Sequence, residues 1–104
     1  MKPRLRSPDE RQAALLEQLH LLIRGETTEG RVLRTLRREV LGLTQKAYAE
    51  RVGVSRRTLS DIERNAGNAS MASLDRVFRP LGLRVGLLPR QPELLAALLE
   101  DVSS

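Results

Sequence analysis

The stretch "QKAYAERVGVSRRTLSDIER", residues 45–64, decides the fold of this chain. Two short helical segments flank Gly53, a residue type that adopts a positive backbone φ without steric cost. Small Ala49 allows the two segments to cross closely. The positions that face inward are apolar: Tyr48, Val52, Val54, Leu59 and Ile62. This pattern predicts a helix-turn-helix motif, in which the back of the second helix packs on the first helix and its front projects.

The projecting front of the second helix is cationic and polar. Because a helix turns about 100° per residue, Arg57, Ser60 and Arg64 all lie within about 100° of Arg56. The apolar residues of this helix lie on the opposite arc. Arginines held at the front of such a helix can donate paired hydrogen bonds to guanine O6 and N7 in the major groove, or bind phosphate. The arrangement therefore indicates contact with double-stranded DNA.

Composition and charge agree with this interpretation. The chain has 104 residues, which suits one domain, with 40% hydrophobic and 30% charged residues. It contains only two aromatic residues, Tyr48 and Phe78, so we expect an aliphatic core. The formal net charge of +5 and the pI of about 10.9 favour a polyanionic partner.

Several other classes of protein are not expected. The chain has no cysteine and one histidine, which argues against disulfides and a zinc site. We find no nucleophile–base pair and no phosphate-binding loop, so we expect neither an enzyme nor a cofactor. No apolar run reaches the ~18 residues of a membrane span, and the first residues lack an export signal. We therefore expect a cytoplasmic protein.

Helical periodicity predicts further helices on both sides of the central motif. One covers residues 8–24, a second runs from Thr27 or Thr28 to Gly42, and another follows from about residue 71 to Pro80. A last, leucine-rich helix occupies residues 92–102. The predicted N-caps are Ser7, which forms a capping box with Glu10, and Thr44 and Ser55.

The segment "LRVGLL", residues 83–88, has a strand-like pattern. A lone strand of about six residues needs a partner for its backbone donors and acceptors. We expect that partner to be the same segment of a second copy, with Val85 and Leu87 facing the helices. The predicted dimerisation residues are Leu83, Arg84, Val85, Gly86, Leu87 and Leu88.

The residues also carry a family resemblance. "LRTLRREVLGLTQKAYAERVGVSRRTLSDIERN", residues 33–65, resembles the Xre/Cro-type helix-turn-helix repressors of bacteria and phages. This resemblance implies a bacterial, nucleoid-associated protein. "NAGNASMASLDRVFRPLGLRVGLLP", residues 65–89, resembles the HipB-like antitoxins of type II toxin–antitoxin modules. The resemblance implies an all-α, lambda-repressor-like bundle with one short C-terminal strand that pairs across a dimer, plus extra N- and C-terminal helices. It implies three parts: a basic arm and helix (1–26), the DNA-binding domain (27–82), and the dimerisation strand with the last helix (83–104).

The resemblance also assigns roles to residues. An internal salt bridge is expected between Arg38 and Glu63. Tyr48 stands where the family usually has leucine, and it either packs or reaches a phosphate. Asp61 either accepts a hydrogen bond from cytosine or faces solvent. The DNA-binding residues implied in this way are Thr44, Gln45, Lys46, Ser55, Arg56, Arg57, Ser60, Asp61 and Arg64.

The implied function is that of a homodimeric repressor of a double-stranded DNA operator. In the HipB-like interpretation, the protein also neutralises a HipA-like toxin kinase and represses its own operon. A solitary Xre regulator and an interaction adaptor that no longer binds DNA remain as alternatives. The basic residues Lys2, Arg4 and Arg6 either follow the phosphate backbone or have no contact with it.

Overall fold

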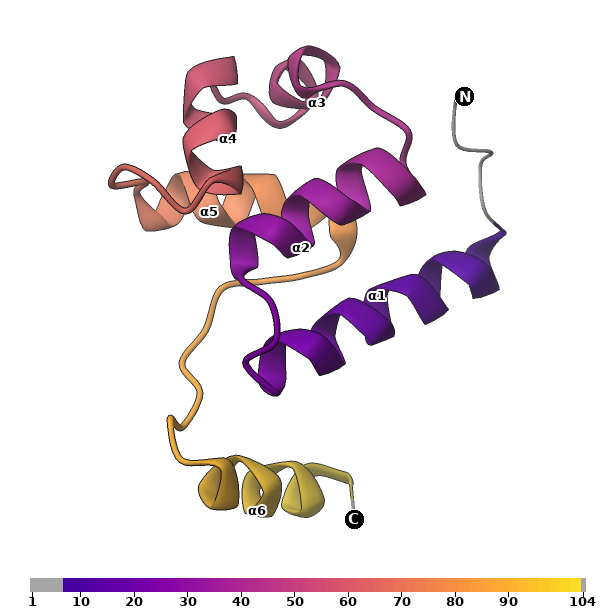
Figure 1. The fold of residues 1–104 in the computed structure, drawn as a ribbon, viewed down its shortest axis with the longest axis vertical. Helices are drawn as coiled ribbons and strands as arrows, with labels where there is room; N and C mark the ends of the chain where they lie inside the picture. The colour runs from indigo at the N-terminus through magenta and orange to yellow at the C-terminus, as the bar shows by residue number, and fades with distance from the viewer. Residues whose placement is uncertain (1–6, 104) are drawn as a thin grey trace.

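The computed structural model describes residues 7–103, which form a bundle of helices (Figure 1). The expectation for Lys2, Arg4 and Arg6 falls outside these residues. In chain order the elements are α1 (Pro8–Ile23), α2 (Glu29–Thr35), the π-helical turn η1 (Leu36–Val40), α3 (Gln45–Val52), α4 (Arg56–Glu63), α5 (Met71–Phe78), the 3-10 turn η2 (Arg79–Leu81) and α6 (Pro92–Ser103). The predicted all-α class is confirmed for this part of the chain.

The helices begin where the capping residues predict. The hydroxyl of Ser7 accepts a hydrogen bond from the Glu10 backbone N–H at 3.2 Å, and the Glu10 side chain completes the capping box. Thr44 and Ser55 cap α3 and α4, each accepting from the N–H three residues later. Between α3 and α4, Gly53 has a φ of 77°, as the tight turn of the motif requires.

The predicted helix that ends at Gly42 contains an irregular turn. After α2, the N–H of Leu41 donates to the carbonyl of Leu36 at 3.1 Å, five residues earlier, instead of four as in an α-helix. This π turn, η1, holds one residue more than an α turn does. It therefore changes which side chain of the segment 36–40 faces the core. Arg37 is buried and Arg38 is exposed.

The core surrounds the helix-turn-helix unit. One apolar cluster joins α2, α3, α4 and α5; its buried members are Leu33, Tyr48, Ala49, Leu59, Ile62, Val77 and Phe78. A second cluster lies where α2 and η1 pack on α1; its buried members are Val32, Leu36 and Val40. The predicted inward residues Tyr48, Leu59 and Ile62 are thus buried, whereas Val52 and Val54 are only partly buried.

A close contact fixes the start of α2 against the end of α4. A Cβ atom on Gly30 would lie 2.4 Å from the backbone oxygen of Ile62, so only glycine fits there. Asn65, which has a positive φ of 56°, accepts from the Gly30 N–H at 3.1 Å and donates to the Thr28 hydroxyl at 2.8 Å. The side chain of Asn65 therefore completes the N-terminus of α2.

The C-terminal part of the chain is packed differently. Figure 1 shows residues 83–91 running away from the bundle to α6, which lies apart from the helix-turn-helix unit. In the described range 7–103, residues 83–88 carry no regular secondary structure, so the predicted strand is not observed. A strand is held by hydrogen bonds to a neighbouring strand, and the single chain offers none there. Leu87 is 100% exposed, so its predicted inward orientation is wrong for the single chain.

Between residues 7 and 103 there is no helix with the length and apolar character needed to cross a membrane.

Candidate nucleic-acid interface

α4 presents two different faces. Leu59 is 0% exposed and Ile62 is 6% exposed, so the back of the helix lies in the core. Arg56 and Arg57 are exposed at its first turn, and neither side chain forms a hydrogen bond or ion pair with another residue in the range 7–103. Two guanidinium groups therefore face solvent from a helix that cannot rotate without exposing its apolar side.

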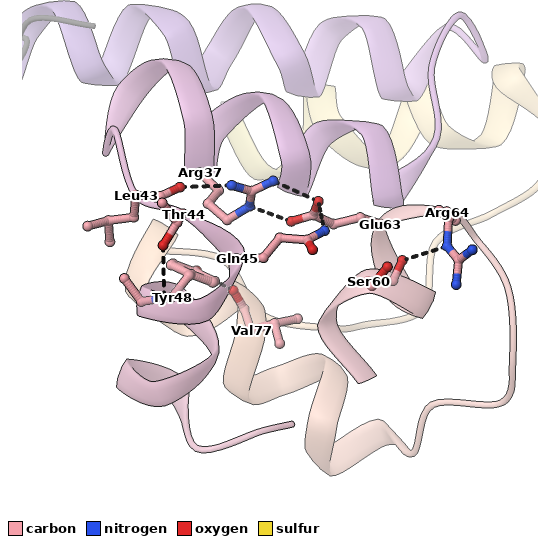
Figure 2. A network of polar contacts seen from close by, with 10 residues as sticks. Arg37, Leu43, Thr44, Gln45, Tyr48, Ser60, Glu63, Arg64 and Val77 are labelled. Atoms are coloured by element: carbon pink, nitrogen blue, oxygen red, sulfur yellow. Dashed lines mark hydrogen bonds and ion pairs between the residues drawn. The ribbon is translucent and has the colours of Figure 1, made fainter. Parts of the chain in front are cut away.

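A buried ion pair fixes the position of α4, and Figure 2 shows its contacts. The Arg37 Nε donates to Oε2 of Glu63 at 2.6 Å, and Arg37 Nη2 donates to Oε1 at 2.9 Å. The third contact of this guanidinium is the Leu43 carbonyl, 2.8 Å from Nη1. The side chains of Arg37 and Glu63 are only 6% and 2% exposed. Such a paired, fork-like geometry is the strongest form of this interaction.

The expected partner of Glu63 is corrected by this geometry. Glu63 has the structural role that the family resemblance implies, but its partner is Arg37, and the prediction of Arg38 is wrong. The extra residue in η1 places Arg37, instead of Arg38, on the side of the turn that faces α4. Two adjacent arginines in the sequence gave no means of choosing between them.

Gln45 joins this network at the start of α3. Its Nε2 donates to Oε1 of Glu63 at 3.1 Å, and its side chain is partly buried (Figure 2). The preceding Thr44 caps the helix, and Lys46 is exposed beside it. One carboxylate thus connects η1, the first residue of α3 and the last residue of α4.

Tyr48 packs in the core and does not reach the surface. Its side chain is 0% exposed, and its hydroxyl donates to the Val77 carbonyl at 2.6 Å. Burial, assisted by the Glu63 carboxylate, raises the pKa of Tyr48 from 10.0 to about 12. Of the two roles left open by the sequence, the structure shows packing.

The second turn of α4 carries polar residues that are partly engaged with one another. The Asp61 carboxylate accepts from Arg64 Nη2 at 2.7 Å, so its negative charge is offset beside the predicted DNA surface. Arg64 Nε also approaches the Ser60 carbonyl at 3.4 Å (Figure 2). The Ser55 hydroxyl is engaged with Thr58, both as the helix cap and as a donor to the Thr58 hydroxyl. Ser55 and Asp61 therefore have structural partners within α4.

The structure brings some of the predicted DNA-binding residues together. Gln45, Ser60 and Arg64 line one open hollow of about 430 Å³ between η1, α3 and α4. Its other lining residues are Arg34, Arg37, Arg38 and Glu63. Arg34 was not predicted as part of this surface, because its position on a helix before the motif carries no sequence signal for it.

The fold and the projecting arginines define a helix-turn-helix protein, and comparison with known proteins agrees. A family model described as helix-turn-helix matches residues 33–88. The chain belongs to this family, of the Xre/Cro type. This membership confirms the expectation that the protein is not an enzyme.

One curated relative is described as a regulator of the helix-turn-helix type. An "Uncharacterized HTH-type transcriptional regulator" of Methanothermobacter thermautotrophicus is 45% identical over 53 residues, which cover 48% of this chain and 77% of the relative. The relative is archaeal, and the bacterial origin expected for the chain stays a prediction. No solved structure matches the chain significantly.

Proposed function

We propose that this protein is a sequence-specific DNA-binding transcriptional regulator that acts on an operator as a homodimer. The observation that carries the proposal is the pair of exposed cations, Arg56 and Arg57, on a helix whose back is locked by Leu59, Ile62 and the Arg37–Glu63 pair. A helix projected in this way fits a major groove about 12 Å wide. The remaining predicted contacts would flank it: Thr44, Gln45, Lys46, Ser55, Ser60, Asp61 and Arg64.

Selection from a random duplex library followed by substitution tests this proposal. The wild-type protein is expected to enrich one operator sequence. Arg56→Ala and Arg57→Ala should each weaken binding to that duplex by about tenfold or more and relax specificity at one base position. Neither change should alter the thermal melt, because both side chains are exposed. Failure to enrich any sequence would contradict sequence-specific binding.

The homodimer is proposed from the exposed apolar surface near residues 83–88. Leu87 and Leu88 are 100% and 61% exposed, and a single recognition helix makes few base contacts. Two copies whose recognition helices lie about one DNA turn apart would double those contacts. Pairing of Leu83–Leu88 with the same segment of a second copy would satisfy their backbone groups and cover these side chains.

The oligomeric state of Val85→Pro tests the dimer. Proline removes a backbone donor and should prevent strand pairing, so sedimentation is expected to give a monomer where the wild type gives a dimer. Helicity measured by circular dichroism should stay unchanged, because α3 and α4 contact neither residue 85 nor its neighbours through backbone hydrogen bonds. A variant that remains dimeric would place the interface elsewhere, on the exposed leucines of α1 or α6.

An antitoxin role is a narrower form of the same proposal. It is supported by the resemblance of residues 65–89 to HipB-like antitoxins. The protein would then bind a HipA-like kinase and repress the operon that encodes both. Co-expression with a kinase-like neighbouring gene should yield a stable complex and relieve toxicity. Without such a neighbour, the protein would be a solitary regulator.

The salt dependence of DNA binding distinguishes the proposed regulator from an adaptor that no longer binds DNA. A DNA-binding domain with forward arginines should bind duplex DNA at about 50 mM salt and progressively more weakly as the salt concentration rises, because phosphate contacts contribute more at low salt. An adaptor that has lost DNA binding would show no complex at that salt concentration. The exposed and unengaged Arg56 and Arg57 favour the regulator.

A further inference from the structure

The hollow between η1, α3 and α4 has a charge that the helix-turn-helix motif alone does not explain. Four arginines line it against a single carboxylate, that of Glu63. Arg37 is fully engaged with Glu63 and Leu43 in the floor of the hollow. Arg34 and Arg38 are exposed on its wall, and neither side chain forms an ion pair or hydrogen bond with another residue in the described range 7–103. The wall therefore holds two cations without a counterion.

The two wall arginines lie next to residues already placed at the DNA-binding surface. Ser60 and Arg64, from α4, line the same hollow, and Gln45 enters it from α3. Arg34 and Arg38 are four residues apart, across the junction of α2 and η1, so their side chains share one side of the helix. A DNA strand that contacts Ser60 and Arg64 would therefore run beside this wall.

Phosphate is the chemical group that this wall fits best. Guanidinium groups donate several hydrogen bonds in a planar fork that matches phosphate oxygens. The carboxylate in the floor is held by Arg37 and Gln45, which removes it as a repulsive neighbour for an anion. The hollow is open and about 430 Å³ in volume, which leaves a backbone phosphate free to approach from solvent.

We propose that the hollow binds a phosphodiester group of the DNA backbone through Arg34 and Arg38, outside the helix-turn-helix motif. This inference rests on the proposed DNA-binding function and extends its surface from α3 and α4 to the first helix of the domain. Phosphate contacts fix the position and orientation of a protein on the duplex and carry no sequence information. Arg34 and Arg38 would thus hold α4 in its groove, while Arg56 and Arg57 read the bases.

The salt dependence of binding tests this division of roles. The dissociation constants of Arg34→Gln and Arg38→Gln are measured on the selected operator duplex and on a random duplex of equal length, at several salt concentrations. Each lost phosphate contact should make the negative slope of the log association constant against log salt concentration less steep by about 1. Each variant should bind both duplexes roughly five- to tenfold more weakly at about 0.1 M salt. An Arg34→Lys variant, which keeps the charge, should retain most of the slope.

Arg31→Gln is the matched control. Arg31 is exposed on the same helix, and its substitution removes the same charge. It lines the neighbouring hollow beside α1, which Arg34 and Arg38 also line, but it does not line the hollow beside α4. Its slope should equal that of the wild type. An equal loss for Arg31→Gln, or unchanged slopes for Arg34→Gln and Arg38→Gln, would overturn the inference. A wild-type protein that binds neither duplex would instead overturn the proposed function, so the two failures are distinct.

Discussion

The helix-turn-helix unit and the segment from residue 83 to α6 differ in how tightly they pack. In the first, apolar contacts and a buried ion pair fix each helix against its neighbours. In the second, Leu95 is buried, but five other leucines are at least 43% exposed: Leu87, Leu88, Leu94, Leu98 and Leu99. α6 has no extensive contact with another helix in the described part of the chain.

This difference separates two tasks. A unit that holds arginines toward DNA, as we propose, must be rigid, because a recognition helix that shifts loses the geometry of its base contacts. A segment that leaves leucines exposed instead offers apolar area, which is the main source of free energy when proteins associate. The comparison predicts that substitutions in the first region alter the stability of the single chain, whereas changes in the second alter its association.

The largest effect is expected at Glu63. Glu63→Ala leaves the Arg37 guanidinium buried without a carboxylate and should lower the free energy of unfolding by about 3–5 kcal/mol, measured in urea. Asp61→Ala is the matched control, since it removes the carboxylate of the more exposed pair with Arg64 and should cost under about 1 kcal/mol. Equal losses would show that the buried pair does not hold the unit together.

Next in size is the close contact at Gly30. Gly30→Ala should destabilise the protein by about 1–3 kcal/mol, because the new Cβ would overlap the backbone oxygens of Ile62 and Glu63. The helix propensity of alanine opposes this loss by up to about 1 kcal/mol, so a destabilised variant shows that the contact dominates. Gly86→Ala, in the other region, meets no atom within 4 Å and should change the melt little. A more stable Gly30→Ala variant would contradict the packing of α2 on α4.

A smaller effect, with a pH signature, is expected at Tyr48. Tyr48→Phe loses the hydrogen bond to the Val77 carbonyl and should cost about 1 kcal/mol at pH 8. The pKa of Tyr48 is raised in the folded state from 10.0 to about 12, so its stabilising contribution is complete below pH 10 and declines as the pH rises through 12. Urea unfolding between these pH values should therefore show the free energy of unfolding of the wild type approaching that of Tyr48→Phe. Parallel pH curves would contradict the burial of the phenol.

The smallest effect is expected from removing α6. A chain that ends at residue 91 loses the burial of Leu95, which is 9% exposed, but it also avoids the entropic cost of ordering α6. Its free energy of unfolding should therefore lie within about 0.5 kcal/mol of that of the full chain when both are monomeric. Thermal melts at two protein concentrations provide the measurement, since association makes the melting temperature depend on concentration. A large loss that grows with concentration would assign α6 to the interface between two copies.

Much of the fold follows from local signals in the sequence. Ser7, Thr44 and Ser55 cap the helices that they are predicted to cap, because an N-cap acts through the backbone N–H three residues later. The buried back of α4 is likewise predictable, since Leu59 and Ile62 lie on one arc. These features depend on residues close in sequence.

The features that the sequence does not predict depend on contacts between residues far apart in the chain or on the pattern of backbone hydrogen bonds. Apolar periodicity does not reveal whether a turn closes after four or five residues, so η1 and the choice of Arg37 were not predicted. Whether residues 83–88 form a strand depends on a second backbone, which sequence pattern alone does not supply. The position of Arg34 beside Gln45 and Arg64 requires the packing of α2 on α4.

The π turn η1 has a consequence for how this chain is compared with its relatives. A relative with one residue fewer between Leu36 and Val40 could form an ordinary α turn there, while the helices before and after the deletion kept their places. Aligned without a gap, the two chains would match Glu63 to Glu63 but would assign its partner to the wrong arginine. An insertion of one residue thus exchanges the roles of two adjacent arginines, sending one into the core and releasing the other to the surface.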